Sequence, residues 1–294
     1  MPRIVPRITL VCATALLSGC AFTSFRATAT REATTEQLAG AALVVESRNG
    51  SLELVADPAL SEVQISAKIT CSGTTQPEAD QRLAGADLSV ARGTDRVLTI
   101  KPVFPGGARN GDGATITVRL PGAGGVDVKT SNGRVNVTGL AGALTIHSSN
   151  GSVSVTDHDG SADIRTSNGA VNVQRLAGSL KVDTSNGSVD VANLGGTAQI
   201  SSSNGPITLA LQPDQAGPIE LHTSNAHIKA SAGRAFIGTV RMDTSNASIR
   251  IGDAAGRVKS KKMAKTSGSI VVGQEGPVSV VETSNGGIEF EIED

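Results

Sequence analysis

The sequence is poor in aromatic residues: its 294 residues include five Phe and neither Trp nor Tyr. Proteins that bind nucleic acids stack bases on aromatic side chains and present a strongly positive surface. Here 26 Lys and Arg residues are balanced by 27 Asp and Glu residues, which leaves a formal net charge of −1. We therefore expect no nucleic-acid partner. Protein interfaces anchored by Trp or Tyr hot spots are excluded as well.

The first 19 residues have the features of a secretory signal peptide. Arg3 and Arg7 precede an apolar run at 8–17, which is shorter than the ~20 apolar residues that span a bilayer. The run ends in Leu17-Ser18-Gly19-Cys20, which resembles the lipobox of bacterial lipoproteins. This resemblance implies lipidation of the Cys20 thiol, cleavage after Gly19, and acylation of the new amino terminus with a fatty acid such as palmitate. The alternative is an ordinary secretory signal that ends near a Cys.

Cysteine is too scarce for a disulfide framework. Of the three Cys residues, Cys12 leaves with the predicted signal and Cys20 carries the predicted lipid, so that only Cys71 remains. We expect an exported protein that its lipid holds at the membrane, facing the periplasm or the cell surface. Ala21 stands where inner-membrane retention signals often place Asp, which favours the outer membrane if the host has two. Residues 20–41 predict a flexible tether, with a short helix at 35–42 as the alternative.

An eighteen-residue repeat fills the second half of the chain. Its marker is an Asn-Gly dipeptide that recurs at intervals of eighteen residues as far as Asn204. Two steps of twenty-one residues follow, and each of them ends at an Asn-Ala dipeptide. Ser267-Gly268 fills the same position in the eighth period. The Asn residues of this series are Asn132, Asn150, Asn168, Asn186, Asn204, Asn225, Asn246 and Asn285.

Each period predicts two short strands. A β-branched residue stands three positions after each marker, from Val135 in the first period to Ile288 in the last, and polar residues alternate with the apolar ones around it. Such alternation is typical of half-buried strands. Because equivalent positions keep their character over nine periods, we expect like residues to stack in a parallel β-solenoid with rungs of about 18 residues. An antiparallel meander is the alternative.

The Thr-Ser-Asn-Gly corner predicts a structural turn. Asn and Gly tolerate the left-handed backbone conformation that a sharp turn requires. Asn side chains stacked at the strand spacing of ~4.8 Å would form an amide ladder. We interpret the eight Asn residues of the series as structural.

The front part of the chain differs from the repeat. Residues 42–57 predict a first rung, and 121–294 the solenoid of repeats. Between them, 58–120 predict a small α+β insertion with strands at 63–69, 97–101 and 114–120 and a helix at 76–85. The exposed end of a solenoid needs a cover, and we expect this insertion to be the cap. The fold class is therefore an all-β, single-stranded parallel β-solenoid with a small α+β N-terminal insertion.

This arrangement resembles the bacterial putative-adhesin domain, a β-strand-repeat domain of unknown function found on envelope proteins. The stretches that carry the resemblance are LVVESRNGSLELV, ATITVRLPGAGGVDVKTSNGRVNV and the TSNG repeats, within residues 43–292. The resemblance implies a right-handed coil and a lipoprotein of the cell envelope. It implies no catalytic residue.

Residues with catalytic or metal-binding chemistry are few. His158 lies in Asp157-His158-Asp159-Gly160 and could ligate a metal with a further partner, but a polar turn explains the cluster better, and we expect neither a metal nor a cofactor. Asp127 and Asp163 are expected two rungs apart, ~9.6 Å, on the outer face, as a polysaccharide-active enzyme would need. One basic run could form a patch for anionic lipid or an acidic polymer, with a solvated loop as the alternative. Its residues are Lys259, Lys261, Lys262 and Lys265.

Three functions follow from these observations. The first is a lipid-anchored, non-catalytic envelope protein whose solenoid is a binding or adhesion surface for a glycan or an envelope protein. Short polar residues on one outer face suit hydroxylated polymers; they are Asn136, Ser154, Asn172, Asp190 and Thr208. The second is a structural or signalling partner within the envelope. The third and weakest is an enzyme that acts on polysaccharides.

Overall fold

The computed structural model describes residues 24–36, 38 and 40–293. Within these residues it contains 25 strands and one helix, and most strands pair in parallel in two long sheets. The predicted all-β solenoid is confirmed, and the antiparallel meander is wrong. The chain divides into two compact units, residues 1–136 and 137–294, which are described in turn.

The first unit contains the predicted first rung. Its strands are β2 (Ala42–Glu46) and β3 (Leu52–Ala56), joined by the Asn49-Gly50 corner. β2 pairs in parallel with β8 (Gly125–Lys129). Apolar side chains at alternate positions point inward and are buried, whereas their neighbours face solvent. β9 (Val135–Thr138) continues the chain into the second unit.

The insertion extends both sheets of this rung. β7 lies parallel to β3 and β4 antiparallel to β7, while β6 lies parallel to β2 and β5 antiparallel to β6. We expected β4, α1, β6 and β7 within a few residues of their observed ends, but not β5. The elements are β4 (Glu62–Gly73), α1 (Gln76–Ala84), β5 (Asp87–Arg92), β6 (Leu98–Val103) and β7 (Gly113–Leu120). That they serve as a cap stays a prediction.

The flexible tether predicted for 20–41 is wrong for most of that segment. Residues Phe25–Glu36 form β1, which pairs antiparallel with β4 over its whole length. Ala27, Ala29 and Ala33 are the buried apolar positions of β1. Alanine side chains add little hydrophobic contrast, so the period-two pattern was weak in the sequence. The described residues of the alternative helix at 35–42 are not helical, since Glu36 ends β1 and Ala42 begins β2.

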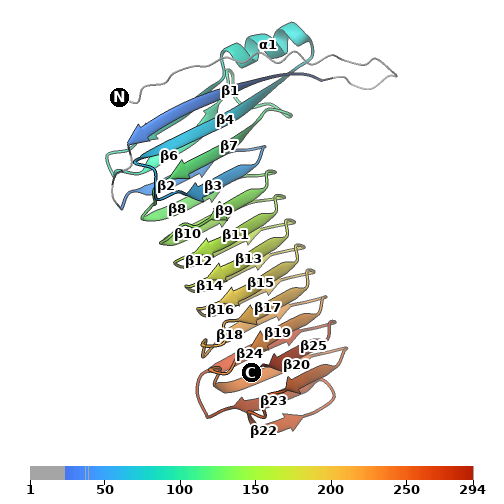
Figure 1. Cartoon of the computed structure of the whole chain (residues 1–294). Helices are drawn as coiled ribbons and strands as arrows, with labels where there is room; N and C mark the ends of the chain where they lie inside the picture. The colour runs from blue at the N-terminus through green and yellow to red at the C-terminus, as the bar shows by residue number, and fades with distance from the viewer. Residues whose placement is uncertain (1–23, 37, 39, 294) are drawn as a thin grey trace. The chain divides into compact units, whose positions relative to one another are not determined.

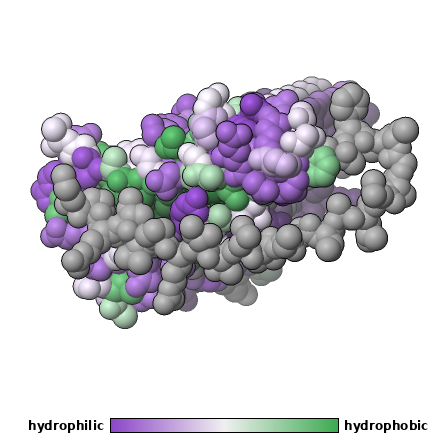
Figure 2. Space-filling model, turned by 90° about the horizontal axis from the view of Figure 1, so that it is seen from above, coloured by the Kyte–Doolittle hydropathy of each residue, from purple (hydrophilic) through white to green (hydrophobic). Residues whose placement is uncertain are grey.

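Helix α1 lies over β4 and β1 (Figure 1). Thr75 caps its first turn, with its hydroxyl accepting a hydrogen bond from the Glu78 backbone N–H at 3.3 Å. Pro77 is tolerated in this first turn because its missing N–H would have no helical partner there. Leu83 faces the sheet and is buried. Figure 2 shows the molecule from above, turned by 90° from the view of Figure 1. The coloured residues in this view are mainly hydrophilic, with smaller hydrophobic areas between them.

The second unit is a stack of parallel coils with two sheets (Figure 1). We call the 12-stranded sheet A and the 13-stranded sheet B. In the second unit, sheet A includes, in order, β11 (Val153–His158), β13 (Val171–Leu176), β15 (Val189–Leu194), β17 (Ile207–Leu211) and β19 (Ile228–Ala232). Sheet B includes, in order, β10 (Ala143–His147), β12 (Ala162–Thr166), β14 (Leu180–Thr184), β16 (Ala198–Ser202) and β18 (Ile219–Thr223). From β10 to β19, each strand pairs in register with the strand one period later, so that Ile146 lies beside Ile164 and Ile164 beside Val182.

We had expected all coils to stack in sequence order, but the last coils do not. β24 (Val278–Thr283) lies between β18 and β20 (Gly238–Thr244), and β25 (Ile288–Ile292) lies between β19 and β21 (Ile249–Asp253). The final coil is thus inserted between two earlier ones. Its Phe290 is buried and packs against buried Phe236, with ring centroids 5.9 Å apart, which fills the core at this level.

A hairpin takes the place of the expected eighth rung. β22 (Val258–Met263) and β23 (Ser267–Val272) pair antiparallel, and β23 also pairs antiparallel with β20. Ser267-Gly268 is therefore not a corner of the Asn series. The segment has the length of a rung, but charged Lys261 stands where other rungs carry an apolar residue. The hairpin completes sheet B, in which β22 is the outermost strand.

Two Asn-Gly corners of the second unit need glycine for a reason other than the one we predicted. Gly169 and Gly187 do not adopt the left-handed conformation. Instead, a Cβ atom at Gly187 would lie 2.0 Å from the carbonyl oxygen of Gly169 in the previous coil. Close stacking therefore excludes a side chain. The non-glycine residues of these coils that adopt the left-handed conformation are Asp157, Arg175 and Asn193, with φ of 54°, 54° and 58°.

Candidate functional site

A groove runs over the outer face of sheet B in the second unit. It has a volume of about 530 Å³ and crosses β10, β12, β14, β16, β18 and β24. Small residues at the strand starts, among them Ala143, Ser161 and Ser179, form one side. Because these side chains are short, they leave the hollow beside the longer side chains of the next outward positions. Val278, 47% exposed, adds an apolar contact surface at one end.

One outward column contributes to the lining of this groove. Its residues lie beside one another across the sheet, and the column continues past the groove to the hairpin. We call this the sheet B column: Thr145, Asp163, Lys181, Gln199, Glu220, Val280, Arg241, Ser269 and Lys262. Its groove section alternates in charge and presents hydroxyl, amide, carboxylate and ammonium groups to the same hollow. Such a surface can hydrogen-bond an extended, hydroxylated ligand.

The outward column of sheet A is also aligned. Ser154 lies beside Asn172, Asn172 beside Asp190, and Asp190 beside Thr208. Beyond Thr208 the column carries Lys229. Asn136, which we expected to begin this column, belongs to the first unit. Both sheets therefore present polar columns, but the groove lies over sheet B.

Hydrogen bonds join the Asn side chains of the second unit. Asn168 Nδ2 donates to Asn150 Oδ1 at 2.7 Å, and the pattern continues through the later coils. The ladder follows the inserted coil, since Asn246 donates to Asn285 and Asn285 to Asn225. In the first unit, Asn132 donates to Asn49. The contribution of these exposed amides to stability stays a prediction.

The basic run does not form one patch. On β22, Lys262 pairs with Ser269 on the outer face of sheet B, whereas Lys261 pairs with buried Ile270 and lies on the opposite face of the strand. Lys259 stands at an irregularity of the strand, and Lys265 follows β22. Lysines on an outermost strand also discourage pairing with other chains. Strand alternation in the sequence was the signal that could have separated Lys261 from Lys262.

The His158 cluster is not an exposed metal-binding turn. His158 is 2% exposed and takes a position that buried Leu176 occupies in the next coil. Its Nε2 lies 3.0 Å from the carbonyl oxygen of Gly142. In the part of the chain that the structure describes, no group of three or more His, Cys, Asp or Glu residues could hold a metal ion.

The two candidate catalytic carboxylates are each paired with a cation on their own strand. Asp127 lies 2.8 Å from Lys129, and Asp163 lies 3.2 Å from Arg165. Asp127 belongs to the first unit and Asp163 to the second. Of these two carboxylates, only that of Asp163 belongs to the lining of the sheet B groove.

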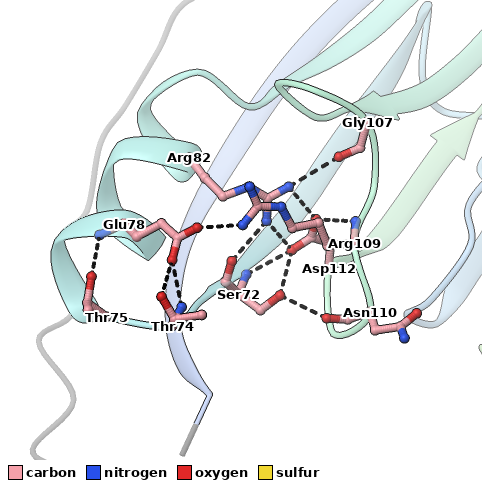
Figure 3. A network of polar contacts seen from close by, with 9 residues as sticks. All are labelled: Ser72, Thr74, Thr75, Glu78, Arg82, Gly107, Arg109, Asn110 and Asp112. Atoms are coloured by element: carbon pink, nitrogen blue, oxygen red, sulfur yellow. Dashed lines mark hydrogen bonds and ion pairs between the residues drawn. The ribbon is translucent and has the colours of Figure 1, made fainter.

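A buried polar network stabilises the first unit, and the sequence did not reveal it (Figure 3). Arg82 on α1 donates two hydrogen bonds to the Asp112 carboxylate, at 2.8 and 2.9 Å. Ser72 and the Arg109 backbone N–H donate to the same carboxylate. The network joins the helix, the end of β4 and the loop before β7. These residues are far apart in sequence, and no local pattern marks them as partners.

The network sets the charge state of its members. Burial raises the pKa of Asp112, but hydrogen bonds from Arg82, Arg109 and Ser72 outweigh burial and lower this pKa to about 2. Hydrogen bonds from Thr74 and Arg109 likewise lower the pKa of Glu78 to about 2. Burial raises the pKa of the neighbouring Cys71 thiol, which makes it unreactive. We interpret the network as structural.

The lipidation site and the signal peptide lie outside the described residues. Cys20 and residues 1–19 therefore stay predictions. Among the residues that the structure does describe, no helix is both long and apolar enough to span a membrane.

Comparisons with known proteins place the fold in a family. A family model described as Toastrack DUF4097 matches residues 42–290. A solved putative adhesin from Bacteroides fragilis NCTC 9343 is 12% identical, with 90% of this chain and 96% of that chain covered and a TM-score of 0.42. A putative adhesin from Parabacteroides merdae ATCC 43184 is 16% identical, with 90% and 95% covered and a TM-score of 0.38. No curated protein matches the chain.

Proposed function

The chain belongs to the Toastrack DUF4097 family, and from this premise we propose that it is a lipid-anchored, non-catalytic protein of the cell envelope that binds hydroxylated polymers in the sheet B groove. The groove carries the proposal. It is long, open and built on regular strands, so a ligand that repeats along its own axis meets similar groups on successive coils. Strands ~4.8 Å apart place these groups at a spacing comparable to that of sugar units.

The chemistry of the groove supports binding rather than turnover. Thr145, Lys181 and Gln199 can donate hydrogen bonds to sugar oxygens, and Asp163 and Glu220 can accept from sugar hydroxyls. Oδ1 of Asp163 is buried and has no hydrogen-bond partner among the described residues, and Oδ2 of the same carboxylate lies 3.2 Å from Arg165. Catalysis of glycoside hydrolysis would require a second carboxyl group positioned to act with Asp163 across the bond. Glu220 lies three strands away, ~14 Å, in the same column.

A pair of matched variants tests the groove against the other sheet. Ser179→Trp places a ring in the groove, and Asn172→Trp places the same ring on the outer face of sheet A; both positions are exposed. We expect Ser179→Trp to lower affinity for a neutral polymer such as dextran roughly tenfold or more, and Asn172→Trp to change it little. Circular dichroism controls for folding. If only Asn172→Trp loses binding, the binding surface lies on sheet A. If the wild type and both variants bind with equal affinity, the groove is not the binding site.

The proposed anchor has its own test. In cells fed labelled palmitate, the wild-type chain should incorporate label and fractionate with membranes, and the outer membrane should hold it if the host has two. Cys20→Ala should lose both properties. Cys12→Ala, which changes the Cys inside the predicted signal peptide, should keep them. Membrane retention of unlabelled Cys20→Ala would refute lipid anchoring.

A further inference from the structure

A second hollow lies at the hairpin end of the sheet B column. It has a volume of about 370 Å³, and its lining includes Arg241, Asp243, Lys262, Ser267 and Ser269. Arg241 lies on β20, Ser267 and Ser269 on β23, and Lys262 on β22. The hollow thus gathers side chains from three neighbouring strands of the hairpin end.

Strand register brings two cations to the sides of one hydroxyl. Arg241 pairs with Ser269, and Ser269 pairs with Lys262, so the three stand in a row across the sheet. Met242, the neighbour of Arg241, is buried, which places Arg241 on the outer face. With strands ~4.8 Å apart, the guanidinium and ammonium groups can reach the same anionic group above Ser269. Neither Arg241 nor Lys262 has an ion pair among the described residues.

The placement of the lysines favours a ligand that enters the hollow over adsorption to a membrane. Lys261 and Lys262 lie on opposite faces of β22, so a flat anionic surface cannot contact both. Asp243 narrows the choice further. Asp243 lines the hollow, and its carboxylate would repel an acidic group placed directly beside it but can accept a hydrogen bond from a neighbouring hydroxyl group.

We propose that this hollow binds the acidic group of a sugar, a carboxylate or phosphate that Arg241 and Lys262 hold while Asp243 accepts from a neighbouring hydroxyl. The inference deepens the proposed function and rests on it, because the hollow lies on the same column that lines the groove. Between Glu220 and Arg241 the column has one residue, Val280. A polymer in the groove therefore reaches the hollow within about two strand spacings, ~10 Å. The substrate class is an acidic polysaccharide.

The test uses the whole chain in neutral detergent, titrated with an oligogalacturonate for the carboxylate and with dextran phosphate for the phosphate. The variants are Lys262→Gln, Arg241→Gln and their combination. Lys261→Gln is the matched control, because it removes the same charge from the adjacent residue on the opposite face. We expect the double variant to lose roughly tenfold or more in affinity for at least one acidic probe, and Lys261→Gln to lose less than about twofold. The probe that responds identifies the acidic group.

Each remaining outcome decides the inference. Equal losses in Lys261→Gln and Lys262→Gln, or binding only to vesicles that contain an anionic phospholipid, would show a diffuse charge effect and overturn the hollow. Acidic probes that do not bind the wild type, or that bind the double variant as well, would do the same. The proposed function is tested separately, because neutral dextran depends on Ser179→Trp and not on Lys262→Gln. If the protein binds dextran but shows no preference for the acidic probes, the proposed groove function stands and the inference about the hollow is refuted.

Discussion

The two units of this protein solve the same problem, the burial of a narrow β core, in different ways. The first unit pairs strands of different lengths in both directions and places a helix over them, and one buried ion pair joins these elements. The second unit repeats one coil, so each inward position meets an equivalent residue above and below. In the first unit, stability depends on a few specific partners. In the second, many equivalent contacts share it.

This difference bears on function. In a repeated coil the inward columns and the glycine corners specify the fold, as in the pairing of Ile146 with Ile164 and the close stacking of Gly187 on Gly169. The outward columns are then free to vary without loss of the fold. The groove and the hollow both lie on such a column, and we found no comparable freedom around Arg82 and Asp112.

The sharpest way to separate the two units is to remove the Asp112 charge. In Asp112→Asn, Arg82 stays buried without its counter-ion, which costs ~3–5 kcal/mol for a pair of this kind. Arg119→Gln is the control, since the Arg119–Asp57 pair is half exposed and should contribute less than about 1 kcal/mol. Urea unfolding with hydrogen exchange resolved by segment should show the loss in α1 and β4. Equal effects of the two variants would mean that the buried pair is not a special element of the first unit.

The same carboxylate predicts a pH dependence. Because the pKa of Asp112 in the folded protein is about 2, below the ordinary value of ~3.9, the ionised form stabilises the fold. This contribution is fully present above about pH 4 and is lost as the pH falls toward 2. Wild-type α1 should therefore lose hydrogen-exchange protection across this window. Asp112→Asn should show a smaller change there.

A smaller loss is expected when the second unit is strained at one corner. Gly187→Ala would place a Cβ atom 2.0 Å from a backbone oxygen, and relief of such overpacking costs ~1–3 kcal/mol. Gly252→Ala is the control, because its Cβ would meet the Glu291 side chain at 3.5 Å, an ordinary contact. Thermal unfolding should separate the two variants. A Gly187→Ala protein as stable as Gly252→Ala would show that the coils can move apart, and that their tight stacking is not a constraint.

The sequence predicted the parts of the fold that follow from the repeat period. It failed for the parts that depend on which coils lie next to one another. The β-branched columns and the corners follow from alternation within eighteen residues. The insertion of the last coil does not, because one rung pattern stacks equally well on any other rung. The contact of Phe236 with Phe290 distinguishes the true order, but nothing local links these residues.

The candidate site was predictable to a similar extent. Alternation placed Asp163 on the outer face, and the structure places it there beside Lys181 of the next coil. That this column lies in a groove depends on short side chains such as Ser179 at the strand starts, which matter only once the coils are stacked. The hollow depends on the antiparallel hairpin, which brings Lys262 beside Ser269. The repeat had suggested a further parallel rung, so this pairing was not foreseen.

The smallest expected effect comes from the exposed Asn ladder, and it tests whether stability in the second unit is shared. Asn186 makes two ladder hydrogen bonds, to Asn168 and from Asn204, each 2.7 Å long. Asn246 makes one, to Asn285. At a net ~0.5 kcal/mol for each exposed bond, Asn186→Ala should cost about 1 kcal/mol and Asn246→Ala about half as much, as measured by urea unfolding. If the bonds polarise one another, Asn168→Ala and Asn186→Ala combined should depart from the sum of the single losses. Single and double variants as stable as the wild type would show that the inward columns alone hold the coils together.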